Sequence, residues 1–93
     1  MRLRKIKNSS KILSNSKNFI PNPELYKGKW SEEFNNSNPI YIEIGMGKGK
    51  FIKENALINK NINYIGIDKF DTILAKALRN INEYIPNLRV INY

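Results

Sequence analysis

Three glycines at alternate positions, Gly45, Gly47 and Gly49, directly follow a β-prone apolar run over residues 40–44. A run of this kind is typical of a strand that is buried on both faces of a parallel sheet. Glycine adopts positive φ at little steric cost and lets backbone amides approach a ligand closely. The pattern therefore predicts a strand, a ligand-holding turn and the start of a helix. A turn that is rich in glycine only to reverse the chain is the alternative, which the elements that follow disfavour.

The residues after the turn alternate between helical and strand patterns. We expect helices over residues 50–60 and 70–85, and strands over residues 63–68 and 87–93. The second helix carries apolar residues at three- and four-residue steps, and Pro86 is expected to end it. The apolar residues expected on the inner side of the first helix are Phe51, Ile52, Ala56 and Ile58.

This order of elements is the beginning of a doubly wound α/β fold, with three parallel strands and two crossover helices. Right-handed crossovers place both helices on one face of the sheet, so the other face is expected to be bare. Residues 40–93 are therefore predicted to be the first part of a larger cofactor-binding domain. Residues 1–39 are predicted to form a polar N-terminal arm with a short helix or two. An independent small α/β module is the alternative, which parallel sheets disfavour because they normally need helices on both faces.

The composition excludes several kinds of chemistry. The 93 residues contain no Cys and no His, which excludes disulfides, Cys/His zinc sites, thiolate nucleophiles and imidazole acid–base catalysis. No apolar run is long enough to span a membrane, and the basic N-terminus continues into polar residues instead of a signal-peptide core. We therefore expect a cytoplasmic protein with neither a membrane nor a metal as partner.

Basic residues concentrate near the N-terminus. The formal net charge is +8, and residues 1–29 contain eight basic residues against a single acidic one, Glu24. Because a basic arm binds phosphate backbones with release of counterions, nucleic-acid contacts are predicted at its start, at Arg2, Arg4, Lys5 and Lys7. A solvated tail that binds nothing specific is the alternative. Tyr26 and Trp30 are expected to attach the arm to the core, a more common role for such aromatic residues than stacking on a base.

The glycine spacing separates three classes of ligand. A nucleoside triphosphate would require GxxxxGK[ST], but here Lys50 follows Gly45 at the wrong distance and precedes Phe51. A dinucleotide would require GxGxxG, and the third glycine falls at position 49 instead of 50. The remaining pattern, E-x-G-x-G-x-G from Glu43 to Gly49, resembles the first motif of Rossmann-like methyltransferases that bind S-adenosyl-L-methionine.

This resemblance implies roles for the two carboxylates. Glu43 is expected to hold the cofactor's ammonium group, directly or through water, because a charge in so apolar a run is costly without a partner. A carboxylate turned to solvent is the alternative. Asp68 ends the second predicted strand and is expected to accept hydrogen bonds from the ribose diol. The predicted cofactor-binding residues are Glu43, Gly45, Met46, Gly47, Gly49 and Asp68.

Four segments resemble successive parts of the bacterial tRNA (guanine-N7-)-methyltransferase family: "MRLRKIK", "NPELYKGKW", "NPIYIEIGMGKGKFI" and "YIGIDKFDTILAKAL". The resemblance implies the Rossmann-like fold of S-adenosyl-L-methionine-dependent methyltransferases, with tRNA as substrate. The family generally has Glu at the end of the second strand, where this sequence has Asp68, so the reach of that carboxylate differs.

The same resemblance implies that the adenine wall and the catalytic segment lie beyond Tyr93. No catalytic residue is therefore predicted in this chain, which is expected to be an incomplete and inactive part of the enzyme. A non-catalytic RNA-binding fragment is the first alternative. A nicotinamide-dependent oxidoreductase fragment is the second, and the glycine spacing disfavours it.

Overall fold

The computed structural model describes residues 9–93, with side chains from Lys11 onward. The predicted RNA-binding residues Arg2, Arg4, Lys5 and Lys7 lie outside the described residues. The helical segments are α1 (Ser9–Asn15), the 3₁₀ helix η1 (Pro23–Tyr26), α2 (Trp30–Phe34), α3 (Lys50–Ile58) and α4 (Asp71–Ile81). The strands are β1 (Phe19–Ile20), β2 (Ile40–Ile44), β3 (Asn63–Asp68) and β4 (Leu88–Asn92). In this part of the chain, no helix is long and apolar enough to cross a membrane.

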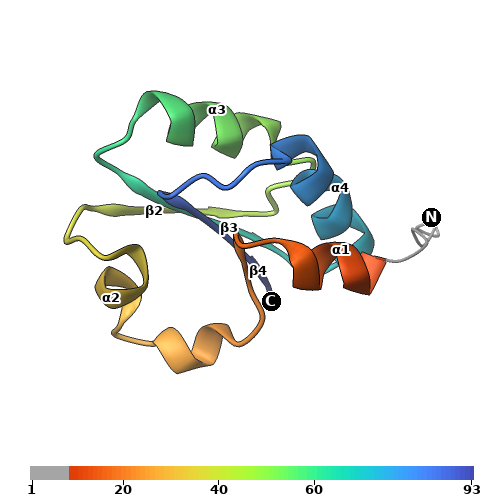
Figure 1. The fold of residues 1–93 in the computed structure, drawn as a ribbon, viewed down its shortest axis with the longest axis horizontal. Helices are drawn as coiled ribbons and strands as arrows, with labels where there is room; N and C mark the ends of the chain where they lie inside the picture. The colour runs from red at the N-terminus through yellow and green to blue at the C-terminus, as the bar shows by residue number, and fades with distance from the viewer. Residues whose placement is uncertain (1–8) are drawn as a thin grey trace.

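The four strands form one parallel sheet in the spatial order β1, β4, β3, β2 (Figure 1). Strands β2, β3 and β4 follow one another across the sheet, and α3 and α4 cross over the same face. The predicted α/β fold, with three parallel strands and two crossover helices, is thus confirmed. The short strand β1 is an addition that the sequence pattern did not predict.

The larger apolar core lies between the sheet and the layer of α1, α3 and α4. It contains residues from all three helices, among them Leu13, Ile52, Ala56, Leu74, Leu78 and Ile81. The expectation for Phe51 and Ile58 was wrong, because these side chains are 59% and 77% exposed. At 3.6 residues per turn, Ile52 and Ala56 share one side of α3 while Phe51 and Ile58 share another, and only the first side faces the sheet.

Helix α4 ends earlier than predicted. Its last residue is Ile81, and Asn82 takes a left-handed conformation with φ 41°, so that its N–H bonds to the Leu78 carbonyl. Asn adopts this conformation more readily than most residues and terminates helices for that reason. Pro86 therefore has no role in ending α4, although Ile85 is still buried in the core.

The expectation of a bare second sheet face was wrong only in part. Ile42 and Ile44 pair with Ile65 and Ile67, so they lie on this face, and they are 54% and 82% exposed, but the rest of the face is covered. A second apolar cluster of Ile20, Phe34, Ile65 and Ile91 lies there, and Tyr26 and Trp30 pack against it. Figure 1 shows α2 on the side of the sheet opposite α3. The expected attachment of Tyr26 and Trp30 to the core is confirmed. The sequence did not predict this cover because Asn and Pro separate its few apolar residues, leaving no periodicity.

Two buried polar side chains join the N-terminal segment to β4. The Nε of Arg89 lies 2.7 Å from Oε2 of Glu33 in α2, and the guanidinium lies 4.9 Å from the centre of the Phe34 ring. The side-chain amide of Asn18 donates hydrogen bonds to the carbonyls of Ile85 and Leu88. Residues 9–39 therefore pack closely on residues 40–93, and the predicted division into an arm and a domain stays a prediction about the whole protein.

Strand β2 departs from the expectation of a strand buried on both faces. It forms the edge of the sheet in residues 9–93, and Ile42 and Ile44 are 54% and 82% exposed. Its inner edge is fully paired with β3, from Ile40 opposite Asn63 to Ile44 opposite Ile67. The glycine turn at its carboxyl end is thus anchored on one side and open on the other.

Candidate cofactor site at the carboxyl ends of β2 and β3

The turn of residues 45–49 has three glycines in left-handed conformations. Their φ angles are 73° at Gly45, 60° at Gly47 and 76° at Gly49, a region that other residues enter only with strain. A Cβ atom on Gly45 or Gly47 would meet nothing within 4 Å, whereas one on Gly49 would lie 3.1 Å from the Cβ of Ala77. The first two glycines therefore border open space, while Gly49 allows α3 to approach α4.

The turn is fixed to β3 by its first two residues. The N–H groups of Gly45 and Met46 donate to the Ile67 carbonyl at 2.8 and 3.2 Å. The Met46 side chain is buried against Gly66, where any Cβ atom would collide with its Sδ. Met46 thus contributes a packed side chain to the core. No hydrogen bond within residues 9–93 uses the N–H groups of Gly47 and Lys48, so these two donors are available to a ligand.

Glu43 lies in β2 just before the turn. Its Oε1 is buried and has no hydrogen-bond partner among the described residues. Burial raises the pKa of the Glu43 carboxyl above its ordinary value of 4.5, because the charged form loses its hydration. A buried acceptor without a partner is uncommon in proteins and indicates a place where a donor group is missing.

Asp68 ends β3 beside the same turn. The strand register pairs Ile44 with Ile67, so Gly45 and Asp68 are the next residues of the two chains. The Oδ1 of Asp68 accepts a hydrogen bond from the Phe70 N–H at 3.2 Å, which orients the carboxylate. Its other oxygen, Oδ2, receives no hydrogen bond from residues 9–93 and can accept from a ligand.

An apolar hollow of about 310 Å³ lies next to the Asp68 carboxylate. Its lining is formed by Ile44, Gly45, Ile67, Asp68, Lys69, Phe70, Ile73 and Tyr93. Small-molecule sites have this character, with apolar walls and a few polar groups that set the ligand's orientation. The structure therefore brings Gly45 and Asp68 together with an apolar wall. From the sequence, such a wall was expected only from residues beyond Tyr93.

The sequence pattern did not predict the residues of this wall. The helical pattern indicated a core position for Phe70, but Phe70 comes just before the first residue of α4 and is 43% exposed. Its position two residues after Asp68, the carboxylate that ends β3, was the sequence signal that could have indicated a place in the site. Within residues 11–93, no group of three or more His, Cys, Asp or Glu side chains is placed to hold a metal ion.

Residues 37–93 match a protein family described as "Putative methyltransferase". The chain belongs to this family. A tRNA (guanine-N(7)-)-methyltransferase of Alkaliphilus oremlandii (strain OhILAs) is 46% identical over 94 residues, which cover 100% of this chain and 44% of that protein. One of Geobacillus sp. (strain WCH70) is 53% identical over 83 residues, covering 88% and 38%.

The solved "Structure of an antibiotic related Methyltransferase" has the same fold, with a TM-score of 0.61 at 24% identity. The match covers 72% of this chain and 36% of that structure. The family resemblance drawn from the sequence segments is confirmed, and membership of a methyltransferase family removes the oxidoreductase alternative. The chain spans less than half the length of the curated relatives that it matches.

Proposed function

We propose that this chain is part of a tRNA (guanine-N7-)-methyltransferase that uses S-adenosyl-L-methionine. The buried, unpartnered Oε1 of Glu43 beside the open glycine turn carries the proposal for the cofactor. Such an oxygen is stabilised by a cationic donor, and the ammonium group of S-adenosyl-L-methionine is one. The proposal for the substrate is supported by relatives named tRNA (guanine-N(7)-)-methyltransferase that are 46–53% identical to this chain.

The groups around the turn fit this cofactor in kind. Glu43 would accept from the ammonium group, and the N–H groups of Gly47 and Lys48 would donate to the carboxylate. Asp68 would accept from the ribose hydroxyls through Oδ2, and the hollow beside it would pack against the adenine ring. Gly49 and the Met46 side chain would act indirectly, by holding the turn against α4 and β3.

The reaction suits a chain without Cys or His. When bound, the cofactor supplies a methyl group attached to a positively charged sulfur. The carbon of this methyl group is the electrophile. The N7 atom of guanine has a free lone pair and carries no proton, so its attack needs no general base. The protein's contribution is then to hold the two reacting groups in line, which is catalysis by positioning. That this chain contains no catalytic residue stays a prediction.

The proposed macromolecular partner is tRNA. The arm residues Arg2, Arg4, Lys5 and Lys7 remain proposed contacts to its phosphates, supported by their charge. The cytoplasmic location also stays a prediction from the sequence.

A chimera tests the proposed function. In it, residues 1–93 replace the matching segment of the Alkaliphilus oremlandii relative, which is more than twice as long as the segment it shares with this chain. We expect labelled methyl groups to enter a tRNA transcript, but not the same transcript made with 7-deazaguanosine, in which a CH group replaces N7. The unaltered relative is the control for the assay. Binding of both transcripts without methyl transfer would contradict the proposal and favour the RNA-binding alternative.

A further inference from the structure

The exposed cations of the molecule gather on the side of the sheet that α1, α3 and α4 cover. These helices and their flanking loops carry nine basic residues, Lys11, Lys17, Lys48, Lys50, Lys53, Lys60, Lys69, Lys76 and Arg79, against Glu54, Asp71 and Glu83. Residues 21–39, on the other side, carry Lys27 and Lys29 against Glu24, Glu32 and Glu33. The sheet thus separates a basic side from a slightly acidic one.

None of these nine cations forms an ion pair with a carboxylate within the described residues. The one ion pair in residues 11–93 joins Arg89 to Glu33, on the α2 side. Hydrogen bonds instead join the segments that carry the cations, namely α3, α4 and the glycine turn. Lys53 Nζ donates to the Asn80 carbonyl at 2.8 Å, and the Asn80 side-chain amide donates to the Lys48 carbonyl at 3.0 Å. An ammonium group has three donors, so Lys53 keeps two for another partner.

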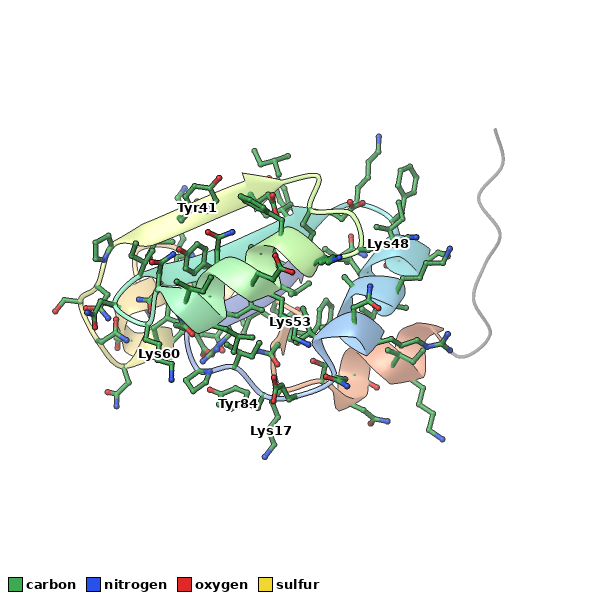
Figure 2. The ribbon with its side chains drawn as sticks, turned by 90° about the horizontal axis from the view of Figure 1, so that it is seen from above. Lys17, Tyr41, Lys48, Lys53, Lys60 and Tyr84 are labelled. Atoms are coloured by element: carbon green, nitrogen blue, oxygen red, sulfur yellow. The ribbon has the colours of Figure 1, made fainter. Side chains whose placement is uncertain are left out.

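The cations extend from the cofactor turn to a groove at the far end of α4. Lys76 lies one helical turn before Asn80, and Arg79 lies next to it. Lys17 and Arg79 line the same groove of about 560 Å³ between the ends of α1 and α4, together with Tyr84. Figure 2 looks onto this side of the molecule, and its labelled Lys48, Lys53 and Lys17 follow one another across it.

We propose that the basic ridge, defined as Lys17, Lys48, Lys53, Lys76 and Arg79, binds the phosphate backbone of the RNA substrate. This inference rests on the proposed function, because that function makes RNA the polyanion that the protein meets. Lys48 belongs to the same turn as Gly45 and Gly47, so an RNA bound along the ridge begins beside the candidate cofactor site. The exposed Tyr84 ring and the two cations that line the groove suit a nucleic acid, although Glu83 also lines it.

Matched pairs of substitutions in the chimera test the ridge. Lys76→Gln with Arg79→Gln removes two charges from the ridge, and Lys27→Gln with Lys29→Gln removes two from the opposite side. Affinity for a fluorescent tRNA transcript is measured by anisotropy from 50 to 300 mM KCl. The ridge variant should weaken binding about tenfold at 100 mM KCl and lower the salt slope by about 1.5, because two phosphate contacts are lost. The control variant should change the slope by less than about 0.5.

Three results would overturn the inference: no tRNA binding by the unaltered chimera, equal losses in both variants, or an unchanged slope in the ridge variant. Polyglutamate that competes as well as tRNA at equal charge would also overturn it, in favour of an acidic protein partner. The chimera separates this inference from the proposed function. Methyl transfer with an unchanged KM for tRNA in the ridge variant would overturn the ridge alone, and ridge-dependent binding without methyl transfer would overturn the function alone.

Discussion

Glu43 is a residue whose charge costs stability in the absence of a ligand. Its Oε1 is buried without a hydrogen-bond partner, and the surrounding strand is apolar. Asp68, by contrast, is oriented by the Phe70 N–H and keeps Oδ2 for a ligand. The two carboxylates flank Gly45 and Gly47, whose open sides give a ligand access to the backbone. We expect such a site to lower the stability of the ligand-free protein and to favour binding of the ligand.

Removal of either carboxylate should weaken cofactor binding. In the chimera, Glu43→Ala or Asp68→Ala should reduce S-adenosyl-L-methionine affinity by about 1–3 kcal/mol, the range for loss of a hydrogen bond to a charged group. Isothermal titration calorimetry measures the change. Glu54→Ala is the control, since Glu54 is exposed on α3 and is not part of the turn. Unchanged affinity in both test variants would contradict the assignment of the site.

The charge of Glu43 should make stability depend on pH in a defined direction. Because its pKa is raised in the folded state, its contribution to stability is full below pH 4.5 and is lost as the pH rises through the folded-state pKa. Glu43→Gln should therefore be more stable than the unaltered chimera at pH 7, and this advantage should shrink below pH 4.5. Urea unfolding of ligand-free protein at pH 4 and pH 7 measures both differences. A Gln variant that is less stable at pH 7 would show that Glu43 has a partner.

At the scale of elements, the position of the glycine turn depends on β3 and α4. Gly66 in β3 leaves room for Met46, and Ala77 in α4 leaves room for Gly49. These contacts explain why glycines alternate in the turn while only two of them border open space. The same logic of small residues at close approaches applies where helices pack on parallel strands.

Gly66→Ala should displace Met46 and with it the turn. Overpacking of this kind costs about 1–3 kcal/mol of unfolding free energy, and cofactor affinity should fall because the Gly47 and Lys48 amides move. Urea unfolding and calorimetry of the chimera measure the two effects. In the double variant with Met46→Ala, the loss should be smaller than the sum of the single losses. Strict additivity would mean that the two residues do not compete for the same space.

The α2 cover should depend on the Arg89–Glu33 pair. Arg89 is 4% exposed and Glu33 21%, so Glu33→Ala leaves a buried guanidinium with one partner fewer. We expect a loss of about 1–3 kcal/mol in unfolding free energy, limited by the remaining bonds from Arg89 to the Pro86 and Leu88 carbonyls. Glu32→Ala, an exposed neighbour on α2, should change the free energy by less than about 0.5 kcal/mol. Equal effects of the two substitutions would argue against the pair as the anchor of α2.

At the scale of the whole molecule, residues 9–93 form a sheet whose faces are covered except along the edge strand β2. Strand β2 has no neighbour on its outer side in these residues, and its exposed Ile42 and Ile44 side chains lie on the same face of the sheet as Ile65 and Ile67. Edges of this kind pair with other strands and promote association. The bare apolar surface that the sequence predicted for this face is thus limited to the part along β2.

The isolated 93-residue chain should therefore self-associate, bind S-adenosyl-L-methionine weakly or not at all, and transfer no methyl group to tRNA. Sedimentation velocity from 5 to 100 μM measures association, and Ile42→Lys should reduce it because a charge on an edge strand opposes pairing. Phe51→Lys, on the exposed side of α3, is the control and should not reduce it. Sustained turnover, or a monomer with a sharp cooperative unfolding transition, would show that the chain is a complete domain.

Local pattern in the sequence was enough to predict the succession of strand, glycine turn, helix, strand and helix, since these signals depend on near neighbours along the chain. The places of Glu43, Gly45 and Asp68 at the carboxyl ends of adjacent strands followed from the same pattern, because parallel strands align these ends. The family could also be predicted, from the segments around the turn.

Only the tertiary structure decided which surfaces meet. Glu33 and Arg89 are 56 positions apart, and no periodicity in residues 21–39 indicated that this segment covers a sheet face. The different surroundings of Gly45 and Gly49, and the apolar wall beside Asp68, likewise depend on how α4 packs and where β4 ends. Such contacts are set by the packing of segments distant in sequence, which local propensity does not encode.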